Sequence, residues 1–153
     1  MTYCFDSSGW IQAWNDLPQG TFPGLWDRIH GLVEESRIIS PDEVLREVAR
    51  KDDAVHAWVK ARSKLFVRLD GSFLARGKEI TNKYPRMLDQ KPGKNGADPF
   101  VVALALDRGA IVVTEEAARN NLTSPGIPDV CKAEKVHCLS VLEFIQRERW
   151  VFR

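Results

Sequence analysis

The sequence predicts an α/β protein, a three-layer α/β/α sandwich around a central, mostly parallel sheet. Short apolar runs typical of buried strands alternate with helical patterns along the chain, which favours parallel strands with helices on both faces. A length of 153 residues fits a single domain over residues 1–153. The net charge of +1 argues against a polyanion-binding coat but is compatible with a local basic groove.

The residue pattern of the N-terminal half predicts two strands and four helices. We expect the strand at 2–5 to be central, because an edge strand at a terminus would fray. Ser40, followed by Pro41 and then Glu43, predicts an N-cap with a capping box. The expected elements are a strand at 2–5, a helix around Trp10 and Trp14, a helix at 25–36, a strand at 37–39, and helices at 41–50 and 53–64.

The C-terminal half continues the alternation. Its one long polar stretch, residues 85–97, holds two prolines and two glycines and predicts a functional loop. The all-round apolar run from Phe100 to Leu106 predicts a deeply packed helix. The expected elements are a short strand or helix end at 65–67, a helix at 71–84, a helix opening at Asp98, a strand at 110–114, a helix at 129–134, a strand at 136–139 and a helix at 140–148.

Cysteine usage and hydropathy point to the cytoplasm. Three cysteines, an odd number, do not resemble a disulfide framework, so we expect free thiols in a reducing compartment. No window approaches the ~18 apolar residues of a membrane span, so we expect a soluble protein without a membrane partner. The apolar tail at 150–152 predicts docking on the body or on a partner.

Four acidic positions stand where an open α/β sheet would gather them. Asp6 and the Glu115–Glu116 pair follow apolar runs that read as strands, whereas Glu47 and Asp98 lie in predicted helices. Ligands in such sheets bind outside the carboxyl ends of the strands. Crowded carboxylates repel each other unless a cation neutralises them, and oxygen donors suit Mg²⁺ or Mn²⁺. The leading hypothesis is a metal-dependent nuclease with Asp6, Glu47, Asp98 and Glu116 as its catalytic set, and with Asp6, Asp98, Glu116 and Glu115 as metal ligands.

Each acid also has a local explanation. Asp98 before Pro99 is a common helix start, and Asp6 can cap the next helix. Glu115 and Glu116 can favour the positive end of a helix dipole. Glu47 flanks the apolar face of its helix, where Arg50 or Lys51 can supply a buried salt bridge. A single metal site explains all four positions together.

Neighbouring polar residues complete the predicted site. Ser7 and Thr114 are candidates to orient carboxylates or waters, with turn capping as the alternative. The tryptophans at 10, 14, 26 and 58 fall on apolar helical stripes and are expected in the core rather than stacked on bases. The candidate contacts to RNA phosphates are Arg86, Lys91, Lys94 and Arg119, with a solvated loop as the alternative.

The arrangement resembles the PIN-domain ribonuclease superfamily over nearly the whole chain. The run YCFDSS resembles its first strand ending in Asp, and Pro41 followed six residues later by Glu47 resembles its helical acid. ADPFVVALAL resembles its Asp-initiated apolar helix. VVTEE places Glu116 where the family pattern has Asp, and Glu115 is the alternative fourth ligand. The C-terminal part resembles a prokaryotic branch often encoded beside a small helix-turn-helix regulator.

The resemblance implies a PIN-like sandwich that hydrolyses RNA phosphodiester bonds with Mg²⁺ or Mn²⁺ and leaves a 5′-phosphate and a 3′-hydroxyl. It also implies the toxin component of a toxin–antitoxin pair, with an antitoxin or helix-turn-helix regulator as partner, and a homodimer. One alternative is a catalytically inactive PIN-like binding module that docks a partner through the 150–152 tail. Another is a doubly wound phosphatase with Asp6 as nucleophile, although Ser8 stands where that reading wants a second Asp.

Overall fold

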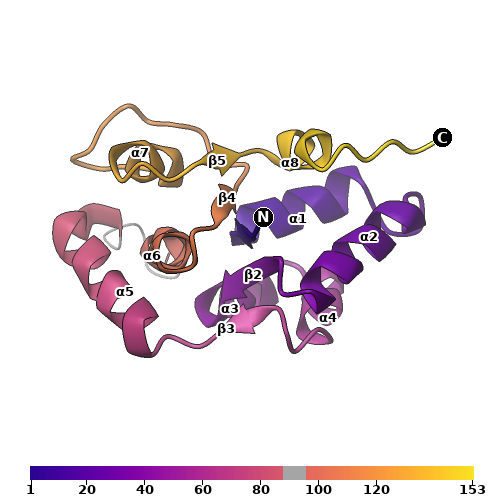
Figure 1. Cartoon of the computed structure of the whole chain (residues 1–153), viewed down its shortest axis with the longest axis horizontal. Coiled ribbons are helices and arrows are strands. Elements are labelled where there is room, and N and C mark those ends of the chain that lie inside the picture. The colour runs from indigo at the N-terminus through magenta and orange to yellow at the C-terminus, as the bar shows by residue number, and fades with distance from the viewer. Residues whose placement is uncertain (88–95) are drawn as a thin grey trace.

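Five parallel strands form one sheet in the order β3-β2-β1-β4-β5. The structure is a computed structural model that describes residues 1–87 and 96–153. Figure 1 shows the sheet crossing the middle of the molecule. The strands are β1 (Tyr3–Phe5), β2 (Ile38–Pro41), β3 (Phe66–Val67), β4 (Ile111–Val113) and β5 (Cys138–Leu139).

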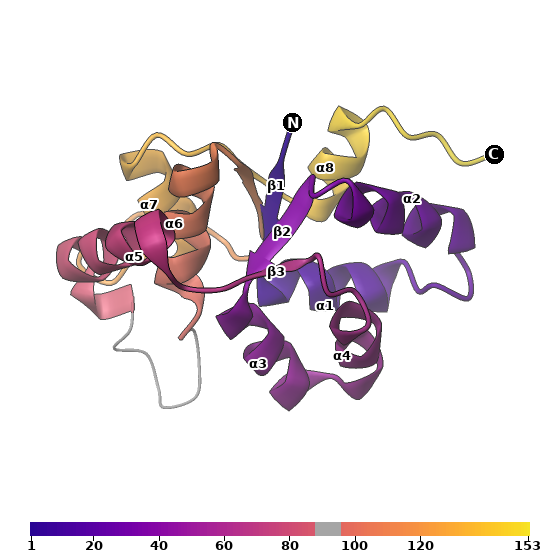
Figure 2. The ribbon, with the colours of Figure 1, turned by 60° about the horizontal axis from the view of Figure 1, so that its bottom comes forward.

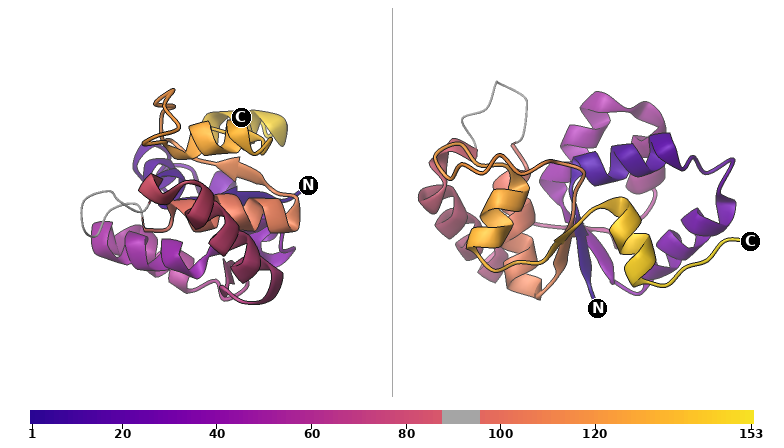
Figure 3. Two further views of the ribbon diagram at one scale, coloured as in Figure 1. Left: turned by 90° about the vertical axis from the view of Figure 1, so that its left-hand side faces the viewer. Right: turned by 90° about the horizontal axis from the view of Figure 1, so that it is seen from above.

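Helices cover both faces of the sheet and make the three layers that the alternating pattern predicts. One group contains α5, α6 and α7, and the other contains α1, α2, α3, α4 and α8 (Figures 2 and 3). The bounds are α1 (Ser7–Asp16), α2 (Pro23–Glu34), α3 (Asp42–Lys51), α4 (Asp53–Lys60), α5 (Gly71–Lys83), the 3-10 helix η1 (Pro85–Met87), α6 (Asp98–Arg108), α7 (Ile127–Ala133) and α8 (Val141–Arg147).

The first strand is central, as predicted. Cys4 lies opposite Ile39 of β2 on one side and Val112 of β4 on the other. Every residue of β1 is fully buried, which is typical of a parallel strand covered on both faces. The order of the strands sets the carboxyl end of β1 beside that of β4, so the residues that follow these two strands become neighbours.

The core predicted from the apolar stripes is confirmed. Trp10 and Trp26 are buried and pack on the buried Trp58, with ring centroids 5.8 Å and 4.9 Å from it. Trp14 is only partly buried and packs against the edge of this core, on Trp26. Residues 101–104 of α6 are fully buried between the sheet and its neighbouring helices. This packing fixes the start of α6, where Asp98 stands.

Ser40 does not cap α3, so the predicted capping box there is wrong. Strand β2 continues through Pro41, which is the N-cap residue and has no side-chain capping bond. The Ser40 hydroxyl instead donates to the Phe5 carbonyl at 2.6 Å and accepts from Trp10 Nε1 at 3.0 Å. A buried indole N–H needs an acceptor. The Ser40 hydroxyl is that acceptor for Trp10, so it does not cap α3.

Two further expectations concern the whole chain. The three cysteines at positions 4, 131 and 138 are free thiols, as the odd count predicts. Within the described ranges, no helix has both the length and the hydropathy that a membrane crossing requires.

Candidate functional site

Asp6 is both a helix cap and a member of a buried acidic cluster. It is 3% exposed at the end of β1 and accepts a hydrogen bond from the Gly9 backbone N–H at 2.7 Å, which caps α1. Its other oxygen accepts from the Thr114 hydroxyl at 2.5 Å. A Cβ at position 9 would lie 3.2 Å from Asp6 Oδ1, so a glycine lets the first turn of α1 close onto this carboxylate.

Asp98 is the centre of the cluster rather than a helix cap. It is the first residue of α6, its predecessor Ala97 is the N-cap residue, and no side chain makes a capping bond there. Burial raises the pKa of Asp98 far above its ordinary value, and the nearby charges of Glu116, Asp6 and Glu47 raise this pKa further. The electrostatic influence of three carboxyl groups on a fourth shows that the chain gathers the four predicted acids in one region.

Glu47 enters this region from α3. It is 2% exposed, and its Oε1 accepts a hydrogen bond from the Ser7 hydroxyl at 3.2 Å. Ser7 and Thr114 therefore each touch a different acid of the cluster, Glu47 and Asp6 respectively. Whether they orient these carboxylates for chemistry remains a prediction.

The two neighbouring glutamates after β4 face different partners. Glu116 hydrogen-bonds to the Asp98 carboxyl group, and its Oε1 accepts from the Ile127 N–H at 3.1 Å. Glu115 turns to the other side, where its Oε1 accepts from the Val141 N–H at 2.8 Å at the start of α8. Glu116 is therefore the member of the pair that joins the acidic cluster.

Two acids of the cluster, Asp6 and Asp98, have raised pKa values. Burial raises the pKa of Asp6 to about 7, against the lowering effect of its hydrogen bonds from Thr114, Gly9 and Ser8, and the charge of Glu116 raises this pKa further. Carboxylates in such surroundings keep protons unless a cation replaces them.

The donor set fits a hard divalent cation by its chemistry. It consists of carboxylate oxygens, which suit Mg²⁺ and Mn²⁺, in a place where their own repulsion raises two pKa values. As the side chains stand in the described part of the chain, no three His, Cys, Asp or Glu residues are close enough together to hold one ion. Cation binding would thus require these side chains to move closer together.

Two of the four predicted RNA contacts lie among the described residues. Arg86 in η1 and Arg119 after β4 are exposed, whereas Lys91 and Lys94 lie outside the described residues. The apolar tail rests on the body: Trp150 packs on Phe144 with ring centroids 5.3 Å apart, and Arg28 lies over the Phe152 ring at 5.0 Å.

A fifth buried acid, Asp129, was missed by the sequence reasoning. It is 8% exposed at the third position of α7 and accepts backbone hydrogen bonds from Arg119, Asn120 and Gly126. The sequence carried a usable signal, since an acid three residues after the N-cap position commonly bonds back to the N-cap amide.

Comparison with known proteins gives a family and a fold. Residues 3–152 match the family model described as "Domain of unknown function (DUF4411)". No curated protein matches the chain. Among solved structures, VapBC2 from Rickettsia felis, crystallised with a DNA fragment from its promoter, is similar with 13% identity and a TM-score of 0.52. The alignment covers 92% of this chain and 98% of that one, and at this identity it supports a PIN-like fold.

Proposed function

This chain belongs to the DUF4411 family, and we propose that it is a metal-dependent ribonuclease of the PIN type. The observation that carries the proposal is a set of buried acids linked by short polar contacts. Asp6, Glu47 and Asp98 are all buried. The Thr114 hydroxyl donates to Asp6 and accepts from the Glu116 N–H, and Ser7, next to Asp6, donates to Glu47. Four carboxyl groups from four separate segments are gathered at the carboxyl edge of a parallel sheet, where ligands of such folds bind. The sequence resemblance to PIN-domain ribonucleases and the similarity of the fold to that of VapBC2 support the same reading.

In this proposal Asp6, Asp98 and Glu116 hold one or two Mg²⁺ or Mn²⁺ ions, with Glu47 completing the set. The cation supplies charge neutralisation and Lewis acidity at the scissile phosphate. Thr114 and Ser7 hold the Asp6 and Glu47 carboxylates through hydrogen bonds of 2.5 Å and 3.2 Å. Hydrogen bonds of this kind preset the direction of a ligand and make it a better donor.

The proposal also includes a substrate, RNA, and a protein partner. Arg86 and Arg119 are exposed and would pair with RNA phosphates, as would Lys91 and Lys94. We propose that the protein acts in the cytoplasm as the toxin of a toxin–antitoxin pair, as a homodimer held in check by an antitoxin or a helix-turn-helix regulator. Co-purification with the product of the adjacent reading frame tests the pairing, and sedimentation tests the dimer.

The decisive experiment is cleavage of mixed RNAs with Mg²⁺, Mn²⁺ or EDTA. Asp98→Asn keeps the size of the side chain but cannot carry its charge, so we expect a loss of cleavage of about 100-fold or more. Asp27→Asn is the matched control, because Asp27 is an exposed aspartate on α2 and its loss should leave the rate unchanged. Cleavage that persists in EDTA, or that is equal in wild type and Asp98→Asn, would refute the proposal.

Thermal stability separates this proposal from an inactive PIN-like binding module. Mn²⁺ should raise the melting temperature of the wild type, since a ligand that binds only the native state stabilises it. The double variant Asp6→Asn with Asp98→Asn should show no such rise. If neither protein responds to Mn²⁺, the acids do not form a cation site and the binding module becomes the better interpretation.

A further inference from the structure

We infer that Asp129 is a positioning residue that holds Glu116 against Asp98 by closing the 117–126 loop onto the start of α7. Nothing in the family description assigns Asp129 a role. The expected effect of Asp129 on metal binding rests on the proposed function. Its effect on the position of the Glu116 side chain does not.

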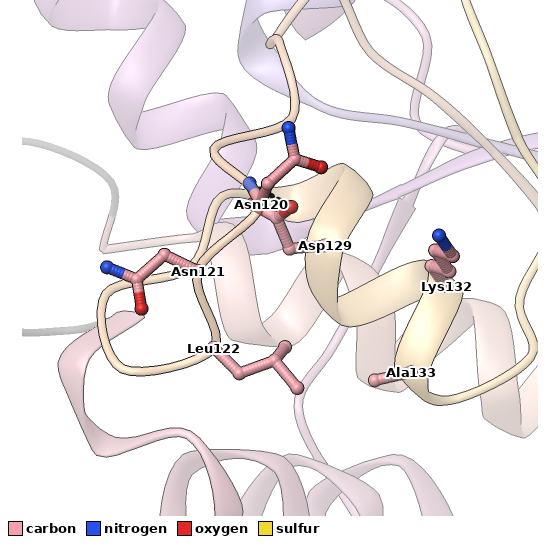
Figure 4. Close-up of a pocket in the computed structure, with 6 residues that line it drawn as sticks. All are labelled: Asn120, Asn121, Leu122, Asp129, Lys132 and Ala133. Atoms are coloured by element: carbon pink, nitrogen blue, oxygen red, sulfur yellow. Dashed lines mark hydrogen bonds between the residues drawn. The ribbon is translucent and has the colours of Figure 1, made fainter.

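Asp129 ties both ends of the loop to one carboxylate. Its Oδ2 accepts from the Arg119 N–H at 2.8 Å and from the Gly126 N–H at 2.9 Å. Its Oδ1 accepts from the Asn120 N–H at 2.8 Å. Figure 4 shows this side chain on the first turn of α7, directly beside Asn120. The charge is fully used, because burial raises the pKa of Asp129 but the three backbone bonds outweigh it and hold this pKa below its usual value.

The tied loop packs directly on Glu116. Gly126, whose N–H binds Asp129, is so close to this glutamate that a Cβ at position 126 would lie 2.7 Å from Glu116 Oε1. The next residue, Ile127, donates its N–H to the same oxygen at 3.1 Å. Any movement of residues 126–127 therefore moves the N–H donor that holds the Glu116 carboxylate, and with it the Glu116 side chain.

Helix capping alone does not account for this geometry. A capping acid at the third position of α7 needs only the N–H of Gly126, the N-cap residue. The two other donors belong to the segment that follows Glu116 directly. One of them, Asn120, has a positive φ of 56°, a conformation that persists when surrounding bonds hold it. Asp129 thus fixes the loop rather than the helix.

Two variants test the link between Asp129 and the Glu116 side chain, one at Asp129 and one at Gly126. Asp129→Asn keeps the shape of the side chain but loses one acceptor and the charge, so the loop is released. Gly126→Ala keeps all three amides and has a φ of −87° at that position, which alanine adopts without strain, so it acts by pushing on Glu116. The matched control is Glu134→Gln at the other end of α7, where Glu134 pairs with Lys83 at 2.8 Å and accepts from the Tyr84 hydroxyl at 2.5 Å.

The first readout is free of metal: the position of the Glu116 side chain in crystal structures of the three variants grown with EDTA. We expect Glu116 to leave Asp98 in Asp129→Asn and in Gly126→Ala, and to stay in Glu134→Gln. A Glu116 that keeps its contact with both Asp98 and Ile127 in Asp129→Asn would overturn the inference, whatever the protein does with metal.

The second readout is Mn²⁺ affinity by calorimetry, at a temperature where circular dichroism shows every variant folded. The two loop variants should bind Mn²⁺ about 10-fold more weakly or worse, in the range known for residues that orient metal ligands, and Glu134→Gln should match the wild type. Equal affinity in all four proteins removes the functional part of the inference. A wild type that does not bind Mn²⁺ refutes the proposed function instead, and the crystal structures still decide whether Asp129 positions Glu116.

Discussion

Asp98 and Asp129 are two aspartates in the first turn of two neighbouring helices, and their surroundings are opposite. Their exposed fractions are nearly equal, 6% and 8%, so burial does not separate them. Asp98 faces the charges of Glu116, Asp6 and Glu47, and its pKa is raised. Asp129 faces three backbone N–H groups, and its pKa is lowered.

The difference teaches how to distinguish a structural acid from a functional candidate. A structural carboxylate has a charge that its own fold has already balanced, as the amides balance Asp129. A carboxylate whose charge is opposed by its neighbours is costly to the folded state. Such a cost is commonly found where a ligand restores the balance. The four predictions below test this distinction, in order of decreasing size.

Removing the balanced acid should cost the most stability. Asp129→Ala leaves the N–H groups of Arg119, Asn120 and Gly126 without their acceptor, and each loss costs about 1–3 kcal/mol when water does not replace it. We expect the free energy of unfolding to fall by about 3 kcal/mol or more, measured by urea denaturation. A fall below about 1 kcal/mol would mean that Asp129 is no more important than a surface residue.

The adjacent glutamates should differ in activity. Glu116→Gln removes the member that contacts Asp98, so RNA cleavage should fall about 100-fold. Glu115→Gln alters the bond to Val141 N at 2.8 Å and should change the rate by less than about threefold, within the range of a lost structural contact. Rates measured on one RNA at saturating Mn²⁺ check both, and the reverse order would make Glu115 the ligand.

Neutralising the opposed acid should stabilise the metal-free protein. At pH 8 with EDTA the wild type must keep a proton on Asp98 or accept a buried charge, and Asp98→Asn avoids both costs. We expect an increase in the free energy of unfolding of about 2 kcal/mol, since each unit of pKa difference corresponds to about 1.4 kcal/mol. Calorimetry of both proteins checks the sign, which is opposite to that expected for Asp129→Ala. A destabilised Asp98→Asn would mean that the cluster is balanced by groups other than a cation.

The pH dependence of stability should also distinguish the acids with a raised pKa from Asp129, whose pKa is lowered. The pKa of Asp6 is raised from 3.8 to about 7 in the folded state, so between these values the native state binds a proton that the unfolded state has lost. The contribution of Asp6 to the free energy of unfolding is fully present below about pH 4 and is lost as the pH rises toward 7. Asp98 extends the loss to higher pH, whereas Asp129, with a lowered pKa, loses stability only as the pH falls below about 4.

Melting temperatures between pH 5 and pH 8 in EDTA measure this slope. The wild type should lose stability by about 1 kcal/mol or more over the range, and the double variant Asp6→Asn with Asp98→Asn should show a flatter curve. Saturating Mn²⁺ should remove the slope from the wild type. A metal-free curve that rises with pH would show that the acids are ionised at no cost.

Much of the fold could be predicted because it depends on local patterns. The alternation of apolar runs and helical stripes identified four of the five strands and a central β1, and left residues 65–67 open between a strand and a helix end. The positions of Asp6 and of the Glu115–Glu116 pair followed from the same pattern, because a residue after a parallel strand must lie at the carboxyl edge, whereas Glu47 and Asp98 lie in helices. Glu115 and Glu116 could not be separated in this way, since the choice depends on the distant amides of Val141 and Ile127.

Errors occurred where a long-range contact replaced a local one. Ser40 has the sequence of a helix cap, but the hydroxyl is taken by Phe5 and by Trp10 from another element. Asp98 has the sequence of a cap before Pro99, but the helix starts one residue earlier and the carboxyl group faces other acids. Asp129 was missed because its partners at 119 and 120 come together with it only when the loop folds back.

The central place of β1 has a consequence for the order of events during synthesis. Asp6 is made before the Thr114 hydroxyl from which it accepts, which is 108 positions further along the chain. Because the sheet can seat β4 beside β1 only after most of the chain is made, a nascent fragment lacks the complete acid cluster. A chain that has been made only as far as α6 therefore cannot bring Thr114 and Glu116 beside Asp6.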